Sequence, residues 1–248
     1  MLTNVLAVMF FVVSFGVVLC LVPLTWVSQY WFGEGLAILL GGLLSQKQKL
    51  EKLGWSLLIL GLIPFFGGTW VFNLKYAEQY YTYKYTVITL GSCLVSGMYL
   101  WLAAKENPPE FGRLGKFATT QFTYFAVINA WLYVLHIGGE IYFHAMPRDY
   151  HFEFYRTVLM AVTNIGFGYL LGKIPLLAGR FSEKMRYLLY GIAIVQGILI
   201  DLSLPVVISF RSLGTGEYVA ILVSAILHLL MLYTLREIIY YIRMKVKR

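Results

Sequence analysis

The sequence predicts an all-α, polytopic integral membrane protein with about eight transmembrane helices and both termini in the cytoplasm. Composition is the first reason: 59% of the 248 residues are hydrophobic and only 13% are charged, whereas about a quarter of a soluble domain is charged. The mean hydropathy of +0.72 agrees with this balance. Together these values exclude a water-soluble enzyme and a disordered chain. Two cysteines are too few for a disulfide scaffold.

Apolar segments of membrane-spanning length are the second reason. A bilayer core about 30 Å thick needs roughly 20 apolar residues per helix. The expected helices lie at residues 4–25, 31–46, 54–74, 85–104, 117–142, 157–178, 186–209 and 217–242. The segment at 31–46 is the shortest, so it crosses the membrane only with little tilt or in a locally thinned bilayer.

The distribution of Lys and Arg is the third reason, and it sets the orientation. Of the 20 cationic residues, 15 lie in alternate connections at 47–53, 105–116 and 173–186 and at the C-terminal end. The intervening connections hold the other five. Because cytoplasmic loops carry the excess of Lys and Arg, the first group is expected in the cytoplasm. The net charge of +8 then indicates contact with anionic lipid, and we expect no nucleic-acid partner.

The organisation expected is one transmembrane domain over residues 1–248, without a linker. Residues 51–58 resemble residues 183–189, which suggests a helical hairpin that is used more than once. Any short basic turn before an apolar helix gives the same pattern, so both interpretations stand. Cys20 and Cys93 lie inside apolar segments, and we expect no disulfide between them.

Two motifs carry a family resemblance. The first is Trp31-Phe32-Gly33-Glu34-Gly35, followed by Leu39-Leu40-Gly41 and a basic turn; the second is Arg186-Tyr187-Leu188, Gly191, Leu199-Ile200-Asp201-Leu202-Ser203 and Arg211. In order and spacing they resemble a family of bacterial multi-spanning proteins called domain of unknown function 2339. The resemblance implies a short or distant member of a bacterial inner-membrane family. It carries no known reaction, so it marks only Glu34 and Asp201 as positions of interest.

Ionisable residues inside the apolar segments are candidates for a polar site. Each costs roughly 3 kcal/mol by insertion scales, so it usually marks a site or a buried pair. In the expected topology Glu34, Glu140, Asp201 and Glu217 all lie toward the outer leaflet. A polar stripe on the fifth helix falls within about 60° at 100° per residue. The hypothetical binding site comprises Glu34, Asn129, Tyr133, His136, Glu140 and Asp201.

A purely structural interpretation of these residues remains open beside the functional one. The glutamates lie near helix ends, where headgroups accommodate a charge. Asp201 could pair with Arg211 or accept a hydrogen bond from Ser203. If the site instead excludes water, its carboxylates could carry protons. Unchanged activity in Glu140→Gln and Asp201→Asn variants would remove the support for such a site.

The sequence contains no motif for catalysis, a metal or a cofactor, and we expect none of these. No nucleophile elbow, phosphate loop or histidine box is present. His136 and His228 differ in expected depth, which disfavours a haem. His144 and His151 are seven residues apart, without the carboxylate pattern of a metal hydrolase.

Aromatic residues are concentrated in the connections expected outside the cell. An interfacial belt explains the tryptophans, whereas five tyrosines within 76–85 exceed what anchoring needs. The hypothetical docking residues are Tyr76, Tyr80, Tyr81, Tyr83, Tyr150 and Phe154.

Three functions follow from these observations. The first is a non-enzymatic inner-membrane component of a cell-envelope assembly, which docks another membrane or envelope protein, a lipid or a glycan through its aromatic outer face. The first alternative is a proton-coupled transporter of a small molecule or lipid that uses the outer carboxylates. The second alternative is a membrane enzyme acting on a lipid-linked substrate, with His136 and Glu140 as its acid/base pair.

Overall fold

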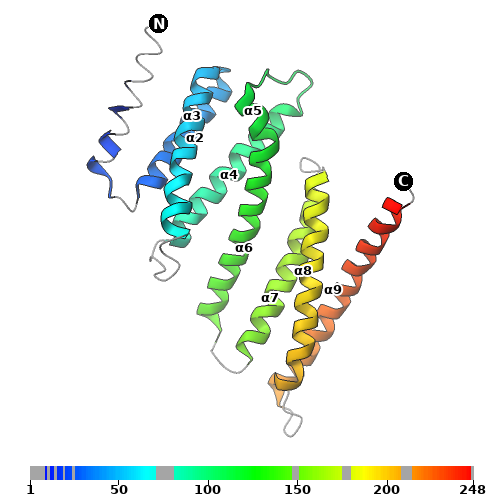
Figure 1. The fold of residues 1–248 in the computed structure, drawn as a ribbon. Coiled ribbons are helices and arrows are strands. Elements are labelled where there is room, and N and C mark those ends of the chain that lie inside the picture. Colours follow the sequence, from blue (N-terminus) through cyan, green and yellow to red (C-terminus); the bar gives the residue numbers. More distant parts are fainter. Residues whose placement is uncertain are drawn as a thin grey trace. The chain divides into compact units, whose positions relative to one another are not determined.

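The structure is a computed structural model, and every element in its described residues is helical (Figure 1). It describes residues 9, 12–13, 16–18, 20–23, 26–70, 81–146, 151–174, 180–207 and 214–246. The chain divides into two compact units, Met1–Ala130 and Trp131–Arg248, where the sequence led us to expect a single domain. The division falls inside one continuous helix, α6 (Thr123–Ala145).

Unit 1 is built on an antiparallel hairpin of two helices. Helix α2 (Val27–Leu44) turns through Ser45–Lys47 into α3 (Gln48–Pro64), which the π-helical segment η1 (Phe65–Trp70) extends. Helix α4 (Tyr81–Ala103) packs against α2, and the short helix α5 (Arg113–Phe117) leads through the π-helical segment η2 (Ala118–Phe122) into α6. Gln46 holds the turn with a positive φ of 55°.

Glycines let the two helices of this hairpin touch along their backbones. Gly35 and Gly42 on α2 are seven residues apart, and so are Gly54 and Gly61 on α3. A Cβ atom at Gly54 would lie 2.5 Å from the Leu39 amide nitrogen, and one at Gly61 would lie 2.5 Å from the Phe32 amide nitrogen. Small residues of this kind allow close helix contact in lipid, where hiding apolar surface gains little.

Unit 2 contains a second hairpin and a third helix. Helix α7 (Phe152–Lys173) packs against α8 (Arg180–Val207), and α9 (Thr215–Val246) packs against both. Their shared core includes Ala161, Tyr190, Ile200 and Leu227, each at most 1% exposed. Both units therefore contain a packed hairpin followed by one further long helix.

Within the residues that the structure describes, five helices are long and apolar enough to cross a membrane. They are Gln48–Gly67, Tyr81–Ala103, Arg113–Ala145, Phe181–Ser203 and Thr215–Val246. Five of the eight expected segments are thereby confirmed as candidate spans. The segments expected at 31–46 and 157–178 are helical in α2 and α7 but are not among the five. Most of the segment at 4–25 lies outside the described residues.

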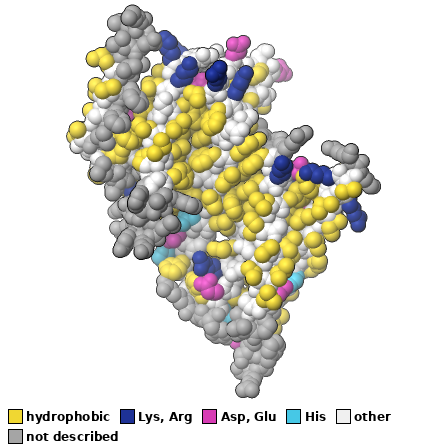
Figure 2. All heavy atoms as spheres, viewed as in Figure 1, with side chains coloured by type: hydrophobic (Ala, Val, Ile, Leu, Met, Phe, Trp, Pro, Cys, Tyr) yellow, Lys and Arg dark blue, Asp and Glu magenta, His cyan; other side chains and the backbone are white. Residues whose placement is uncertain are grey.

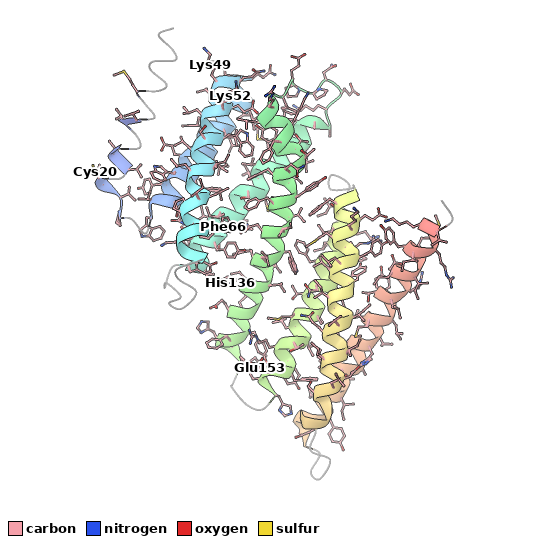
Figure 3. The ribbon with its side chains drawn as sticks, viewed as in Figure 1. Cys20, Lys49, Lys52, Phe66, His136 and Glu153 are labelled. Atoms are coloured by element: carbon pink, nitrogen blue, oxygen red, sulfur yellow. The ribbon has the colours of Figure 1, made fainter. Side chains whose placement is uncertain are left out.

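Side-chain chemistry follows the expected pattern. Hydrophobic side chains cover most of the helix surfaces, while Lys and Arg gather at helix ends (Figure 2). In unit 1, Lys49 and Lys52 project where α2 turns into α3 (Figure 3). We call this the basic end of unit 1; it also includes the connection between α4 and α5, with Lys105, Arg113 and Lys116.

Candidate functional site

An ionisable pair joins two candidate membrane spans of unit 2. The Nε2 atom of His228 on α9 lies 2.9 Å from Oδ2 of Asp201 on α8. The Nδ1 atom of the same ring lies 2.7 Å from the backbone oxygen of Ser224. The two side chains are 44% and 43% exposed at the surface of the described chain.

The packing of α8 against α9 explains why these two side chains meet. Ile200 and Leu227 are buried in the core between the helices, so the next residue on each helix lies at the edge of the interface. Gly197, one turn before Asp201, leaves room for the Met231 side chain, and a Cβ atom there would collide with its sulfur. The pair is therefore set by the register of this contact.

Both ring nitrogens of His228 face hydrogen-bond acceptors, and this fixes the number of protons at the site. A neutral imidazole has one N–H and one lone pair. A backbone oxygen can only accept, so Nδ1 must carry a proton. Contact between Nε2 and the carboxylate then needs a second proton, on either His228 or Asp201. Both contacts are hydrogen bonds at the same time only if the pair carries one proton more than a neutral histidine beside an ionised aspartate.

A second polar contact crosses unit 2 between three helices. The indole N–H of Trp131 on α6 donates to Oδ1 of Asn164 on α7 at 2.8 Å. The amide nitrogen of Asn164 donates to Oε1 of Gln196 on α8 at 2.9 Å. Asn164 is buried, and Gln196 lies five residues before Asp201. Polar side chains in this unit therefore satisfy one another between helices.

The predicted binding residues do not form one cluster within a single unit. Asn129 belongs to unit 1, where its amide nitrogen donates to Thr89 Oγ1 at 2.9 Å; Glu34 is on α2 of the same unit. Tyr133, His136 and Glu140 lie on the part of α6 that belongs to unit 2. Figure 3 shows His136 on that helix. Exposed Glu140 lies 3.7 Å from His144 Nε2.

Asp201 has a partner that the sequence did not indicate. Ser203 donates to the backbone oxygen of Ile200 and not to Asp201, and Arg211 lies outside the described residues. His228 was not identified from the sequence as the partner of Asp201. A lone imidazole in the middle of an apolar helix was the available signal.

The predicted docking residues have different surroundings. Tyr83 is 63% exposed and meets the edge of Trp26 at 6.4 Å between ring centroids. Tyr81 stacks on Phe65 at 6.1 Å. The prediction is wrong for Phe154, which is 3% exposed in the core of unit 2 and cannot contact a partner. Tyr76, Tyr80 and Tyr150 lie outside the described residues.

Metal-binding and disulfide chemistry have no positive support in the part of the chain that the structure describes. Within it, no group of three or more His, Cys, Asp or Glu side chains is placed to hold a metal ion. Cys20 and Cys93 are free and exposed.

No family model, curated protein or solved structure matches this chain in the three comparisons made. The resemblance to domain of unknown function 2339 therefore stays a prediction from its motifs. The function must be argued from the geometry of the chain itself.

Proposed function

We propose that this chain is a multi-pass inner-membrane protein that works as a proton-coupled carrier of a small molecule or lipid. The contact between His228 and Asp201 is the observation that supports this proposal, because it needs one bound proton. Ionisable side chains inside transmembrane helices are costly and usually belong to ion or proton pathways. A site that gains and loses a single proton is what coupling to a proton gradient requires.

The position of the pair gives protons a route to the site. Asp201 lies six residues before the end of α8, or about 9 Å along a helix axis. Both side chains are more than two fifths exposed. In the proposed topology the membrane surface is close enough for its water to exchange protons with the carboxylate and the ring.

The proposal includes a topology of eight spans with both termini in the cytoplasm. The Lys and Arg clusters then face the cytoplasm, and Asp201 lies toward the outer side. The helices α2 and α7 would complete the count together with the segment at 4–25. In this arrangement the carrier would take up its proton from outside the cell.

Proton flux into proteoliposomes with a trapped pH-sensitive dye tests the function. We expect Asp201→Asn and His228→Gln each to lower flux at least about tenfold, because each removes a proton-exchanging group. A double variant, Asp201→His with His228→Asp, exchanges the partners and should recover part of the flux. Glu153→Gln is the matched control, since this carboxylate on α7 is exposed and forms its ion pair with Arg156 at 3.4 Å. Full flux in both single variants would overturn the proposal.

A second candidate function is docking within a cell-envelope assembly. The exposed ring of Tyr83 favours it, because a tyrosine beside Trp26 on the surface of α4 can contact a partner. Tyr and Trp are enriched at the centres of protein interfaces. This function is compatible with proton binding in unit 2, and the two are tested with different variants.

A further inference from the structure

We propose that unit 1 contains a second proton site, Glu51, served by a buried path of hydroxyl groups along α4. Glu51 is in the first turn of α3 at the basic end, and only 7% of it is exposed. The proposal goes beyond the pair in unit 2, because it concerns different residues in a different unit. The test by proton flux rests on the proposed carrier function, whereas the test by infrared spectroscopy does not.

Glu51 has the surroundings of a proton-exchanging carboxyl group. The Tyr99 hydroxyl donates to its Oε1 atom at 2.6 Å, and the Trp55 indole N–H donates to the Tyr99 oxygen at 3.0 Å. Trp55 and Tyr99 are fully buried. The described residues give the Glu51 carboxylate this hydrogen bond and no ion pair. A carboxylate buried without a cation depends on hydrogen bonds such as this one for its stability.

The cations on the neighbouring elements form no ion pair with Glu51 in the described part of the chain. Lys52 on the same helix and Arg113 and Lys116 on α5 are exposed. On α4, the titratable group facing Glu51 is Tyr99. On α2, the backbone at Gly42 approaches Glu51, since a Cβ atom there would lie 2.6 Å from the Glu51 amide nitrogen.

A stripe of hydroxyl groups continues from Tyr99 along α4. Its members are Tyr85, Thr89, Ser92, Ser96 and Tyr99, and all are buried. At 100° per residue they fall within about 80° of one another, and they cover about 21 Å of helix. At the far end the Tyr85 hydroxyl donates to the Asn129 backbone oxygen at 3.5 Å, and Asn129 donates to Thr89.

Ser92 and Ser96, in the middle of the stripe, have buried hydroxyl groups without a hydrogen-bond partner in the described part of the chain, and this is the second observation that supports the path. Elsewhere on these helices hydroxyls bond a backbone oxygen one turn back, as Thr86 does with Thr82. Cβ atoms three or four residues apart on a helix are about 5–6 Å from one another, so one water molecule can bridge the hydroxyls of Ser92 and Ser96.

A cavity at the basic end lies close to Glu51 and is bounded on that side by Phe111. Its volume is about 600 Å³, and it is lined by Ala103, Pro108, Pro109, Glu110, Phe111 and Lys116. The Phe111 ring packs on Tyr99 at 5.3 Å between centroids. A Cβ atom at Gly115 would lie 2.6 Å from Phe111 Cβ and 3.0 Å from Glu51 Oε1. Phe111 and Gly115 therefore separate the cavity from the carboxylate.

The transfer itself is a balanced proton exchange. A hydronium ion that reaches Glu51 from the cavity, past Phe111, gives its proton to the carboxylate and becomes water. The resulting carboxylic acid later gives that proton to a water molecule in the stripe, which re-forms the carboxylate and a hydronium ion. The Tyr99 hydroxyl keeps Oε1 in place and is a positioning group for this exchange.

Infrared difference spectra of the full-length protein in detergent, recorded between acid and neutral pH, test Glu51 directly. We expect a protonated-carboxyl band that is lost in Glu51→Gln, shifted in Tyr99→Phe and unchanged in Glu106→Gln, which removes an exposed carboxylate at the same end. Because exposed carboxyl groups also become protonated at acid pH, the decisive signal is the band that Tyr99→Phe shifts, and persistence of that band in Glu51→Gln overturns the proposal. If Glu51→Gln fails to fold, Tyr99→Phe replaces it, because this variant keeps the ring and removes the hydroxyl. A band that does not shift in Tyr99→Phe then overturns the proposal.

Proton flux in proteoliposomes tests the path. We expect Glu51→Gln to lower flux at least about tenfold, and Ser92→Ala with Ser96→Ala to lower it severalfold. Ser56→Ala, which removes an exposed hydroxyl on α3 bonded to Lys52, should leave it unchanged. Normal flux in the double serine variant overturns the path. Absence of flux in the unaltered protein would refute the carrier function. The infrared band of Glu51 would still show whether this residue binds a proton.

Discussion

Tyr83 and Tyr85 are two residues apart on α4 and differ in exposure, which makes them a matched pair. Tyr83 is 63% exposed, whereas Tyr85 is buried and its hydroxyl donates to the Asn129 backbone oxygen. We expect Tyr83→Ser to change the free energy of unfolding by less than about 0.5 kcal/mol and to abolish recovery of a docking partner after crosslinking in membranes. Tyr85→Ser should destabilise the protein by about 3 kcal/mol. Undiminished crosslinking of Tyr83→Ser would exclude this ring from docking.

Single residues also show where the sequence was informative. Asp201 was identified because an acid in an apolar segment is conspicuous. Its partner was not, since 27 residues and the packing register of two helices separate it from His228. Phe154 was assigned to a docking surface because it lies in an aromatic connection. Sequence position indicates depth in the membrane, but it does not indicate that this ring faces the core.

At the scale of elements, the α2–α3 hairpin depends on which glycines face the partner helix. A methyl group at Gly54 would lie 2.6 Å from Leu39 Cα, whereas one at Gly41 meets nothing within 4 Å. We expect Gly54→Ala to destabilise the hairpin by about 1–3 kcal/mol. Gly41→Ala should be neutral or stabilise by up to about 1 kcal/mol. Thermal unfolding in detergent measures both, and equal effects would show that the hairpin does not require backbone contact.

Helix positions followed from apolar periodicity, while their finer structure did not. The segment expected at 31–46 is α2 over Val27–Leu44. The basic connection expected at 47–53 is mostly helical, because α3 begins at Gln48; this places Glu51 on a helix beside Tyr99. The π-helical turns η1 and η2 insert a residue without changing composition. Hydrophobic patterns therefore do not reveal them.

At the scale of the whole molecule, the two units share a plan that the sequence only suggested. The similar segments 51–58 and 183–189 both lie near the start of the second helix of a hairpin, in α3 and α8. Each hairpin is followed by one further long helix, α4 or α9. The division into units was not predicted, because it falls within the uninterrupted apolar helix α6. Composition has no break at such a boundary.

The proposed topology has a consequence for the two sides of the membrane, and labelling of single cysteines tests it. In a background with Cys20→Ser and Cys93→Ser, an impermeant thiol reagent should label Glu153→Cys in intact cells. It should label Lys49→Cys, Glu110→Cys and Lys245→Cys only after permeabilisation, because Lys and Arg clusters stay in the cytoplasm. Lys49 follows α2, so its side decides whether α2 crosses. With the N-terminus in the cytoplasm, labelling of both Lys49→Cys and Glu110→Cys from outside would mean that α2 does not cross, because α3 and α4 return the chain to the same side. The number of spans would then be odd, and the two termini would lie on opposite sides.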